Sequence, residues 1–265
     1  MRQKTPQKTL FTPFFSSFVR KFGIMLQKTK GIVLHVLKYA DASLIVDVYT
    51  ERFGRLAFSV RMSKSKRSQV RTSLFQPLAL LDMEIDYKPN RQLQRVQSMA
   101  SEYPYSTIPY NPVKSTIAMY LSEVLYRIIR EQVSDERLFS YLYYSLLWLD
   151  RAERGIANFH LVFMMRLSRF LGIYPNLDDF SSSSFFDMRN SCFTPMLPGH
   201  SQYLIPSEAS KLPLLLRMNY DTMYLFSFTR SERDRCLELI SDYYRLHIAD
   251  FAEIKSYEIL KEVFS

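Results

Sequence analysis

This chain of 265 residues lacks several features that catalytic, secreted or membrane proteins depend on. It has two cysteines, Cys192 and Cys236, which excludes a disulfide framework and favours a reducing compartment. Its six glycines stand apart, so neither phosphate-binding motif, GxGxxG or GxxxxGKS/T, can be written. No run reaches the roughly 18 apolar residues that a membrane-spanning helix requires. These absences argue against ATPases, dinucleotide enzymes and membrane proteins.

Positive charge is concentrated in the first part of the chain. The formal net charge is +9, and residues 25–104 carry 13 Lys and Arg against 7 Asp and Glu. Residues 105–265 are close to neutral, at −2. An excess of positive charge favours an anionic partner, which is nucleic acid or a membrane surface. We therefore expect such a partner to bind the first part of the chain.

Residues 1–24 differ in composition from the rest of the chain. They combine five basic residues and five phenylalanines with no acidic residue and no regular period. We interpret them as a non-native or disordered extension, with Met25 as the natural start. The alternative is a flexible basic arm. N-terminal mass analysis of the natural protein would decide between the two.

The spacing of apolar residues divides residues 25–265 into two parts. Apolar residues alternate in five short runs, 32–37, 44–49, 55–61, 81–87 and 93–99, with turns expected at 51–54 and 89–90. Five strands in about 75 residues indicate a small barrel, such as the OB-fold. From Pro112 the period becomes 3.6, with apolar stripes in residues 113–128, 138–149, 159–170, 206–218, 237–248 and 257–264. We predict an α+β protein, with an OB-fold barrel in residues 25–104 and an all-α domain in residues 105–265. Residues 176–204 form an irregular insert.

A cluster of basic residues follows the third predicted strand. A backbone-tracking groove needs such charges because each neutralised phosphate releases counterions. Aromatic rings nearby, at Phe53, Tyr39, Phe75 and Tyr87, are candidates for stacking on bases. The alternative is a solvated basic loop without a partner. The predicted nucleic-acid-binding residues are Arg61, Lys64, Lys66, Arg67 and Arg71, with Lys88, Arg91 and Arg95 beside the last hairpin.

Four arginines lie beside apolar helix faces: Arg127, Arg130, Arg166 and Arg169. Arginine next to an exposed apolar groove suits the capture of an acidic, hydrophobic peptide tail. The alternative is ordinary surface arginine, whose stem covers apolar area while its head group stays in water.

Other candidate sites are weaker. Asp82, Glu84 and Asp86 share one strand face and could hold a divalent metal for a nuclease, although such a row is more often the wet face of a strand. Cys192 and His200 are too few for zinc, which needs four ligands. His160 is interpreted as a core or surface residue, and no nucleophile with a base and an orienting group is evident. We therefore expect no metal, no cofactor and no enzymatic activity.

Several segments resemble the RecO recombination-mediator family. GIVLHVLKYADASLIVDVYTERFGRLAFSVR (31–61) and the SKSKRS stretch after it are similar to the family's opening, and FHLVFMMRLSRFLGIYPNL (159–177) to its central helix. FFDMRNSCF (185–193), PGHSQYL (198–204) and the terminal DYYRLHI and KSYEILKEVF are also RecO-like. The resemblance covers residues 25–264. Some family members hold zinc through four cysteines where this chain has residues 176–192, and only Cys192 remains here.

The resemblance implies an OB-fold joined to a helical domain and a cytoplasmic, nucleoid-associated role in bacteria. It implies binding to single- and double-stranded DNA, annealing of complementary strands, and cooperation with RecR in loading RecA onto DNA covered by single-strand-binding protein. The acidic C-terminal tail of that protein would dock on the helical domain. The alternative function is a protein adaptor that does not itself bind DNA.

Overall fold

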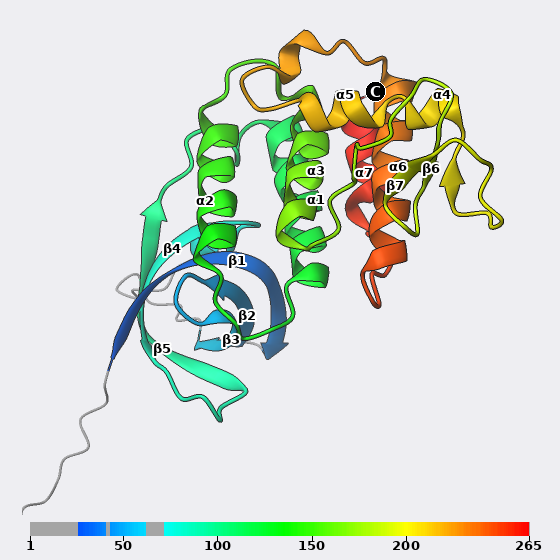
Figure 1. The fold of residues 1–265 in the computed structure, drawn as a ribbon. Coiled ribbons are helices and arrows are strands. Elements are labelled where there is room, and N and C mark those ends of the chain that lie inside the picture. Colours follow the sequence, from blue (N-terminus) through cyan, green and yellow to red (C-terminus); the bar gives the residue numbers. More distant parts are fainter. Residues whose placement is uncertain (1–25, 41–42, 62–71, 265) are drawn as a thin grey trace, which may run out of the picture.

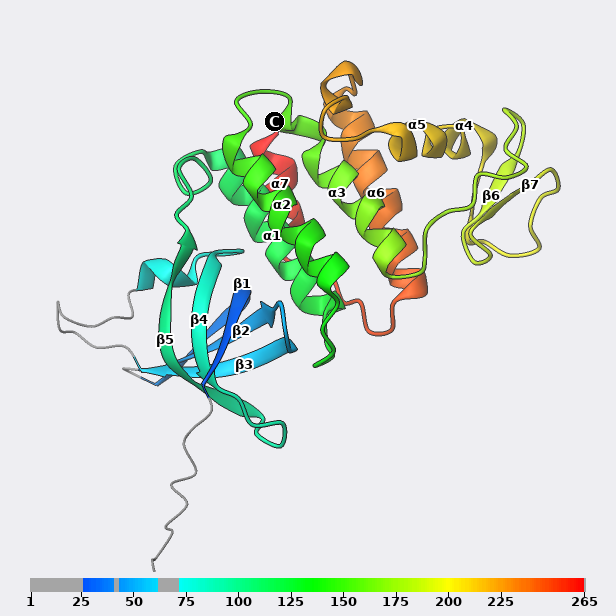
Figure 2. The ribbon, with the colours of Figure 1, turned by 60° about the vertical axis from the view of Figure 1, so that its left-hand side comes forward.

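The computed structural model describes residues 26–40, 43–61 and 72–264. A closed five-stranded barrel is followed by a larger helical body (Figure 1). Figure 2 shows the barrel at one end of the helical body and a small sheet at the opposite end. The predicted fold class, an OB-type barrel followed by a helical domain, is confirmed.

The barrel strands are joined in the order β1-β2-β3-β5-β4, and β4 closes back onto β1. Closure between β3 and β5 uses a short parallel pairing of residues 57–59 with residues 93–95. Every strand predicted from alternating apolar residues is present. The strands are β1 Gln27–Ala40, β2 Ser43–Thr50, β3 Gly54–Arg61, β4 Leu80–Asp86 and β5 Leu93–Tyr103.

Alternation along each strand sends one set of side chains into the barrel. Val46, Val48, Phe58 and Met83 are buried there. β1 pairs with both β2 and β4 at Gly31, and a Cβ at that position would lie 2.5 Å from a Val48 methyl carbon and 2.9 Å from the Met83 sulfur. Glycine at this position therefore permits the close crossing of three strands.

The helical body begins at Pro112, whose helix is capped by the Asn111 side chain. Thr229 and Glu232 form a capping box at the start of the longest helix. Among the described residues, no helix has both the length and the hydropathy needed to cross a bilayer. The helices are α1 Pro112–Ile128, α2 Glu136–Arg151, α3 Phe159–Phe170, α4 Pro206–Ala209, α5 Leu212–Arg217, α6 Arg230–His247 and α7 Ser256–Val263.

The insert that was expected to be irregular contains a three-stranded sheet. Its strands are β6 Phe185–Asp187, β7 Cys192–Thr194 and β8 Tyr203–Leu204, in the order β7-β6-β8. Strands of two or three residues are too short to produce a recognisable alternation. The sheet packs against α4 and α6 at the end of the body remote from the barrel (Figure 2).

The connection between barrel and helices is held by a buried carboxylate. Asp150, at the end of α2, accepts hydrogen bonds from the backbone N–H groups of Ser106, Thr107 and Ile108 at 2.8–3.0 Å. The buried Lys114 ammonium donates to Thr107 Oγ1 and to the Asp150 carbonyl at 2.7 and 2.9 Å. Burial alone would raise the pKa of Asp150, but these backbone hydrogen bonds lower it. Asp150 therefore stays ionised and provides the charge that Lys114 faces.

A second contact joins the barrel to the end of α1. Arg55 Nη1 donates to the carbonyls of Tyr126 and Ile129, each at 2.9 Å, while Nε and Nη2 donate to Asp47 at 3.2 and 3.0 Å. The carbonyls at a helix C-terminus carry partial negative charge, so a guanidinium there is stabilising. A Cβ on Gly54 would lie 2.6 Å from the Val133 backbone, which shows how closely the β2–β3 turn approaches the helical body.

Candidate nucleic-acid interface

One outer face of the barrel crosses four strands. Strand register places Leu37 beside Ile45, Ile45 beside Ser59, and Ser59 beside Arg95. Arg61 lies two residues after Ser59 and therefore points to the same face. We call this surface, made of Leu37, Ile45, Ser59, Arg61 and Arg95, the barrel face. Strands β2 and β3, which form its centre, are where OB-folds bind oligonucleotides.

The two arginines of the barrel face are available to a ligand. Arg61 and Arg95 are both exposed, and neither forms an ion pair with any residue that the structure describes. Asp47, which belongs to the same side of β2, is engaged by Arg55 at 3.0 Å. The positive charge of this face is therefore not neutralised by the described part of the barrel.

The other predicted basic residues divide into two groups. Lys64, Lys66, Arg67 and Arg71 lie outside the described residues. Lys88 and Arg91 gather around Asp86, with nitrogen–oxygen distances of 3.9 and 3.2 Å. Arg95 is opposite Asp86 in the strand register but forms no ion pair with it. The hairpin thus brings two predicted cations around one carboxylate, beside the barrel face.

Gln94 explains why this hairpin keeps its shape. Its buried amide accepts from Lys88 N at 3.1 Å and donates to the carbonyls of Lys88 and Arg91 at 2.8 and 2.7 Å. A buried side chain that satisfies three backbone groups fixes the turn and so positions Lys88 and Arg91. The sequence pattern did not identify Gln94, because a scaffolding amide has no charge or motif.

The four candidate stacking rings have different environments. Tyr39 is 73% exposed near the end of β1 and is free to stack on a base. Phe53 and Tyr87 stack on each other, with ring centroids 4.3 Å apart. The prediction for Phe75 is wrong, because its ring is 8% exposed and belongs to the barrel core.

Two of the three acidic residues of β4 are engaged by neighbouring side chains. Glu84 lies 3.5 Å from Lys28 and accepts from the Ser98 hydroxyl at 3.3 Å, whereas Asp86 binds the hairpin cations. Within residues 26–40, 43–61 and 72–264, no three His, Cys, Asp or Glu side chains are placed to hold a metal ion. The positions of Asp82, Glu84 and Asp86 therefore match the solvent-facing side of strand β4.

The four helical arginines do not form one groove. Arg130 bonds Asp250 at 3.1 Å, and Arg169 lies against Tyr174, with its Nη2 2.7 Å from the hydroxyl. Arg127 and Arg166 line two different pockets. In each of these two, Nε is buried and has no hydrogen-bond partner among the described residues.

Arg166 belongs to a groove with aromatic walls between α2 and α3. Trp148 stacks on Tyr220 at 5.2 Å, the Arg166 guanidinium lies 5.9 Å from the Tyr220 ring, and Tyr144 is 67% exposed. The groove continues into a second pocket that shares Tyr144, Trp148 and Tyr220, and the two measure about 610 and 730 Å³. We call this the aromatic groove. Its basic residues are Arg137, Arg151, Arg154 and Arg166, and its acidic residues are Glu136, Glu153 and Asp221.

The sequence pattern missed most of this groove. Tyr144 and Trp148 lie one helical turn apart on α2, off the leucine stripe that the periodicity identified. Tyr220 comes from the segment between α5 and α6, more than 70 residues later. The sequence shows only the i, i+4 pair of Tyr144 and Trp148. That pair does not indicate that Tyr220 completes the groove.

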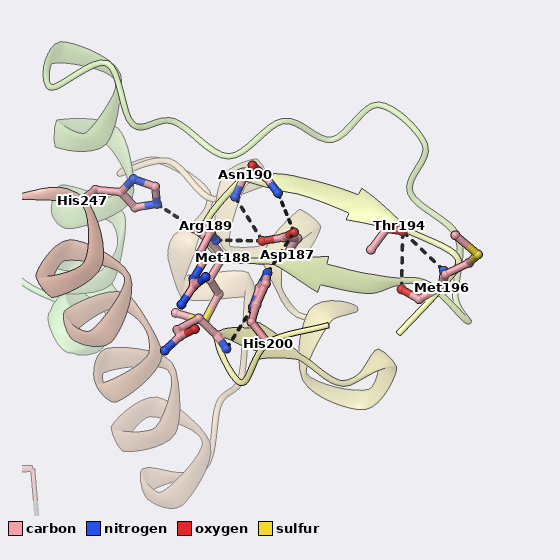
Figure 3. Close-up of polar contacts among 9 residues, drawn as sticks. Asp187, Met188, Arg189, Asn190, Thr194, Met196, His200 and His247 are labelled. Carbon is pink, nitrogen blue, oxygen red and sulfur yellow. Dashed lines mark hydrogen bonds and ion pairs between the residues drawn. The ribbon is translucent and has the colours of Figure 1, made fainter. Parts of the chain in front are cut away.

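A polar cage surrounds Asp187 in the small sheet, where the family resemblance led us to look for a zinc site (Figure 3). The Asp187 carboxylate accepts from Arg189 N at 2.9 Å, from Asn190 N and Nδ2 at 3.1 and 2.7 Å, and lies 3.3 Å from His200 Nε2. His247 Nε2 lies 2.7 Å from the Met188 carbonyl, which ties the same turn to α6. Asp187 thus links β6, the following turn and the segment before β8.

The donor set does not fit zinc. Burial, together with the nearby Asp187 and Asp179 carboxylates, raises the pKa of the Cys192 thiol, which disfavours the thiolate that binds metal. Cys236 is buried on α6, where burial raises its pKa to about 11. The Asp187 cage, which we define as Asp187, Asn190 and His200 with the 188–190 turn, uses hydrogen bonds where a metal would use thiolates.

His160 is a core residue and not a catalytic base. It is 1% exposed on α3, stacked against Phe264 at 5.4 Å, and its Nδ1 has no partner among the described residues. Burial, with Arg233 nearby, lowers its pKa to about 3. His160 is therefore neutral at physiological pH.

Comparisons with known proteins agree with this architecture. Residues 25–105 match the family described as "Recombination protein O N terminal", and residues 109–258 match "Recombination protein O C terminal". The chain is 53% identical to "DNA repair protein RecO" of Phocaeicola vulgatus and 55% identical to that of Bacteroides fragilis. In both cases 241 residues align, covering 91% of this chain and all of the relative. It is 34% identical to the Flavobacterium psychrophilum protein of the same name, over 90% of this chain and 99% of the relative. The chain belongs to the RecO family of DNA repair proteins.

Proposed function

We propose that this protein is a recombination mediator that binds single- and double-stranded DNA on the barrel face, anneals complementary strands, and with RecR helps load RecA onto DNA covered by single-strand-binding protein. The observation that carries the proposal is a pair of exposed arginines, Arg61 and Arg95, on the barrel face, where no described carboxylate forms an ion pair with them. In OB-folds generally, the face around strands 2 and 3 binds oligonucleotides. The family named for DNA repair supports it. The work is physical: basic side chains hold phosphates, and no bond is made or broken.

The barrel face would bind strands by charge with little sequence preference. Arg61 and Arg95 would contact phosphates, while exposed Tyr39 would stack on a base. The basic residues Lys64, Lys66, Arg67 and Arg71 would extend the track, and Lys88 and Arg91 would contact strands at its edge. A DNA partner would bring the protein to the nucleoid of the bacterial cell.

Salt titration of single-strand binding tests this proposal. Replacing Arg61 and Arg95 with glutamine should weaken affinity for all sequences alike, and should lower the slope of log K against log salt by about 0.7 for each lost phosphate contact. Arg217→Gln on α5, exposed and remote from the barrel, is the matched control and should leave the slope unchanged. An unchanged slope in the double variant would remove the barrel face as the binding surface.

Charge reversal at Lys64, Lys66 and Arg67 tests the rest of the predicted track. Binding to every sequence should weaken in this triple variant, because three phosphate contacts are replaced by repulsion. Unchanged affinity would count heavily against these residues as part of the site.

The aromatic groove would receive the acidic C-terminal tail of single-strand-binding protein. An apolar side chain would enter between Tyr144, Trp148 and Tyr220, and a carboxylate would meet Arg166, whose Nε has no partner in the described part of the chain. Of the four arginines expected to bind the tail, Arg166 has the most suitable surroundings. Trp148 is the only tryptophan of the chain, so its fluorescence should change when the tail binds, and Arg166→Met should reduce that response.

The alternative is a protein adaptor that does not touch DNA, which the two arginine-lined pockets favour. In that case, the unaltered protein would show no salt-dependent affinity for single strands, while tail binding to the aromatic groove would remain.

A further inference from the structure

A pocket lies at the seam where the barrel meets α1 and α7. It measures about 480 Å³, and we call it the seam pocket. One wall is the stretch of β1 from Val33 to Val36, and the opposite wall is formed by the two helices. Its apolar lining comes from Val33, Val36, Phe75, Pro77, Met119, Tyr126 and Ile259.

The charge around this pocket is positive. Its ionisable residues are His35, Glu123, Arg127 and Lys255. Both Glu123 oxygens are occupied, since they accept from Lys255 N and Ser256 N at 2.9 Å and from the Ser256 hydroxyl at 2.8 Å. Burial alone would raise the pKa of Glu123, but these hydrogen bonds and, to a smaller extent, the charge of Arg127 lower it, so the ionised carboxylate holds the start of α7.

Arg127 supplies a buried donor to this pocket. Its Nε is buried and has no hydrogen-bond partner within the described residues, and the charge of its guanidinium acts on Glu123, one helical turn earlier, where it helps to lower the pKa of that carboxyl. A buried donor left unsatisfied is destabilising, and a guanidinium fork fits a carboxylate with two parallel hydrogen bonds. Arg130, one turn further along, is already bonded to Asp250 and to the Arg127 carbonyl. The guanidinium that the pocket wall offers to a ligand is therefore that of Arg127.

We propose that the seam pocket is a second peptide-binding site, which takes an acidic segment ending in an apolar residue. The terminal carboxylate would pair with Arg127, the terminal side chain would fill the apolar lining, and preceding acidic residues would lie near Lys255 and His35. The volume accommodates one large side chain, and the walls are too apolar to follow a phosphate backbone. This site is independent of the aromatic groove, with which it shares no lining residue.

A ligand in the seam pocket would touch both parts of the protein. β1 contributes to the barrel, and α1 ends at the carbonyls that Arg55 holds. A partner bound here would therefore sit beside the barrel and would leave the aromatic groove free for a second peptide. One chain could in this way hold two acidic chain ends at once.

The probe is a synthetic pentapeptide of three aspartates, leucine and a C-terminal phenylalanine, labelled with fluorescein at its N-terminus. Fluorescence anisotropy reports binding at either site, whereas Trp148 emission, measured with unlabelled peptide, reports the aromatic groove alone. We expect Arg127→Met to reduce the anisotropy signal, with roughly tenfold weaker binding at one site, and to leave the Trp148 response unchanged. The same peptide with a C-terminal amide in place of the carboxylate should lack the binding component that depends on Arg127.

Two further variants guard against a folding defect. Ile259→Asp places a charge at the pocket entrance on a residue that is already 47% exposed, and it should weaken the same component. Arg130→Met removes an arginine beside the pocket that does not line it, and binding should be unchanged. Arg166→Met should abolish the Trp148 response while the Arg127-dependent component remains.

The outcomes separate the two sites. A binding component that responds to Arg127→Met and Ile259→Asp supports the seam pocket, even if Trp148 never responds and the aromatic groove proposal fails. If all binding follows Trp148 and neither seam variant alters it, the seam pocket proposal is overturned while the aromatic groove stands.

Discussion

The barrel and the helical body present their arginines in opposite ways. On the barrel face Arg61 and Arg95 are exposed, whereas in the helical body Arg127 and Arg166 each bury Nε in the wall of a pocket. An exposed guanidinium attracts anions at a distance, and salt screens it. One held in an apolar wall selects a ligand by shape and by the fit of a carboxylate. The surroundings of an arginine, more than the number of arginines, distinguish a surface for a polyanion from a site for a peptide.

Removing the buried carboxylate that connects the barrel to the helical body should have the largest effect on the free energy of unfolding. Asp150→Ala leaves the buried Lys114 ammonium without a countercharge, so we expect the free energy of unfolding to fall by about 3–5 kcal/mol. Urea denaturation measures this loss. Asp221→Ala, which removes an exposed carboxylate, should have little effect. A loss at Asp150 as small as that of the control would show that Lys114 is solvated.

Removing the contact of Arg55 with the end of α1 should lower the free energy of unfolding by a smaller amount. Arg55→Met removes hydrogen bonds to two α1 carbonyls and to Asp47, and we expect a loss of about 2–3 kcal/mol. The comparison variant is Arg52→Met, in the turn just before β3, whose guanidinium bonds the Lys28 carbonyl and lies over Phe53. Thermal unfolding followed by circular dichroism should separate the two variants; equal melting temperatures would rule out Arg55 as a fastening between barrel and helices.

Acid should act on the helical body through His160. The pKa of His160 is lowered to about 3 in the fold, against about 6.5 when unfolded, so the unfolded chain binds the proton first as pH falls. Stability contributed by neutral His160 is therefore complete above pH 6.5 and decreases towards pH 3, by about 1.4 kcal/mol per pH unit. His160→Leu should remove that part of the slope in urea titrations between pH 7 and pH 5, whereas His35→Gln on the barrel should retain it. Identical slopes in wild type and His160→Leu would refute the assignment.

Removing the charge of the Asp187 cage should have the smallest effect on the free energy of unfolding. Asp187→Asn keeps the shape of the side chain but loses its charge, and we expect a loss of about 1 kcal/mol, confined to the small sheet. Hydrogen exchange of residues 185–204 would show faster opening there. A chelator should leave the melting temperature of the unaltered protein unchanged, and a drop on adding EDTA would show that a metal takes part.

The regular elements were predictable because one periodicity dominates each of them. The apolar residues alternate in β2 and β3 and form stripes on α1 and α3. Both patterns arise because each element buries one side, and such a pattern can be recognised in the sequence. The predicted helix of residues 206–218 is interrupted, with α4 ending at Ala209 and α5 beginning at Leu212.

The sites were less predictable than the elements. The sequence grouped Arg127 with Arg166 because each lies beside an apolar stripe, but the fold places them in different pockets. Phe75 follows a basic stretch and was a reasonable stacking candidate, yet tertiary packing buries it. Partners such as Tyr220 come from distant segments, and a pattern read along one helix contains no information about which segment will cover it.

The Asp187 cage also changes what the protein requires from its surroundings. Four thiolates would make the fold depend on a supply of zinc and on sulfur that remains reduced, because oxidants convert thiolates to disulfides and sulfur acids. The cage consists of carboxylate oxygens and of amide and imidazole nitrogens, which do not enter that oxidation series. The cross-link that Asp187 makes within the small sheet therefore contains no thiolate for oxidants to attack.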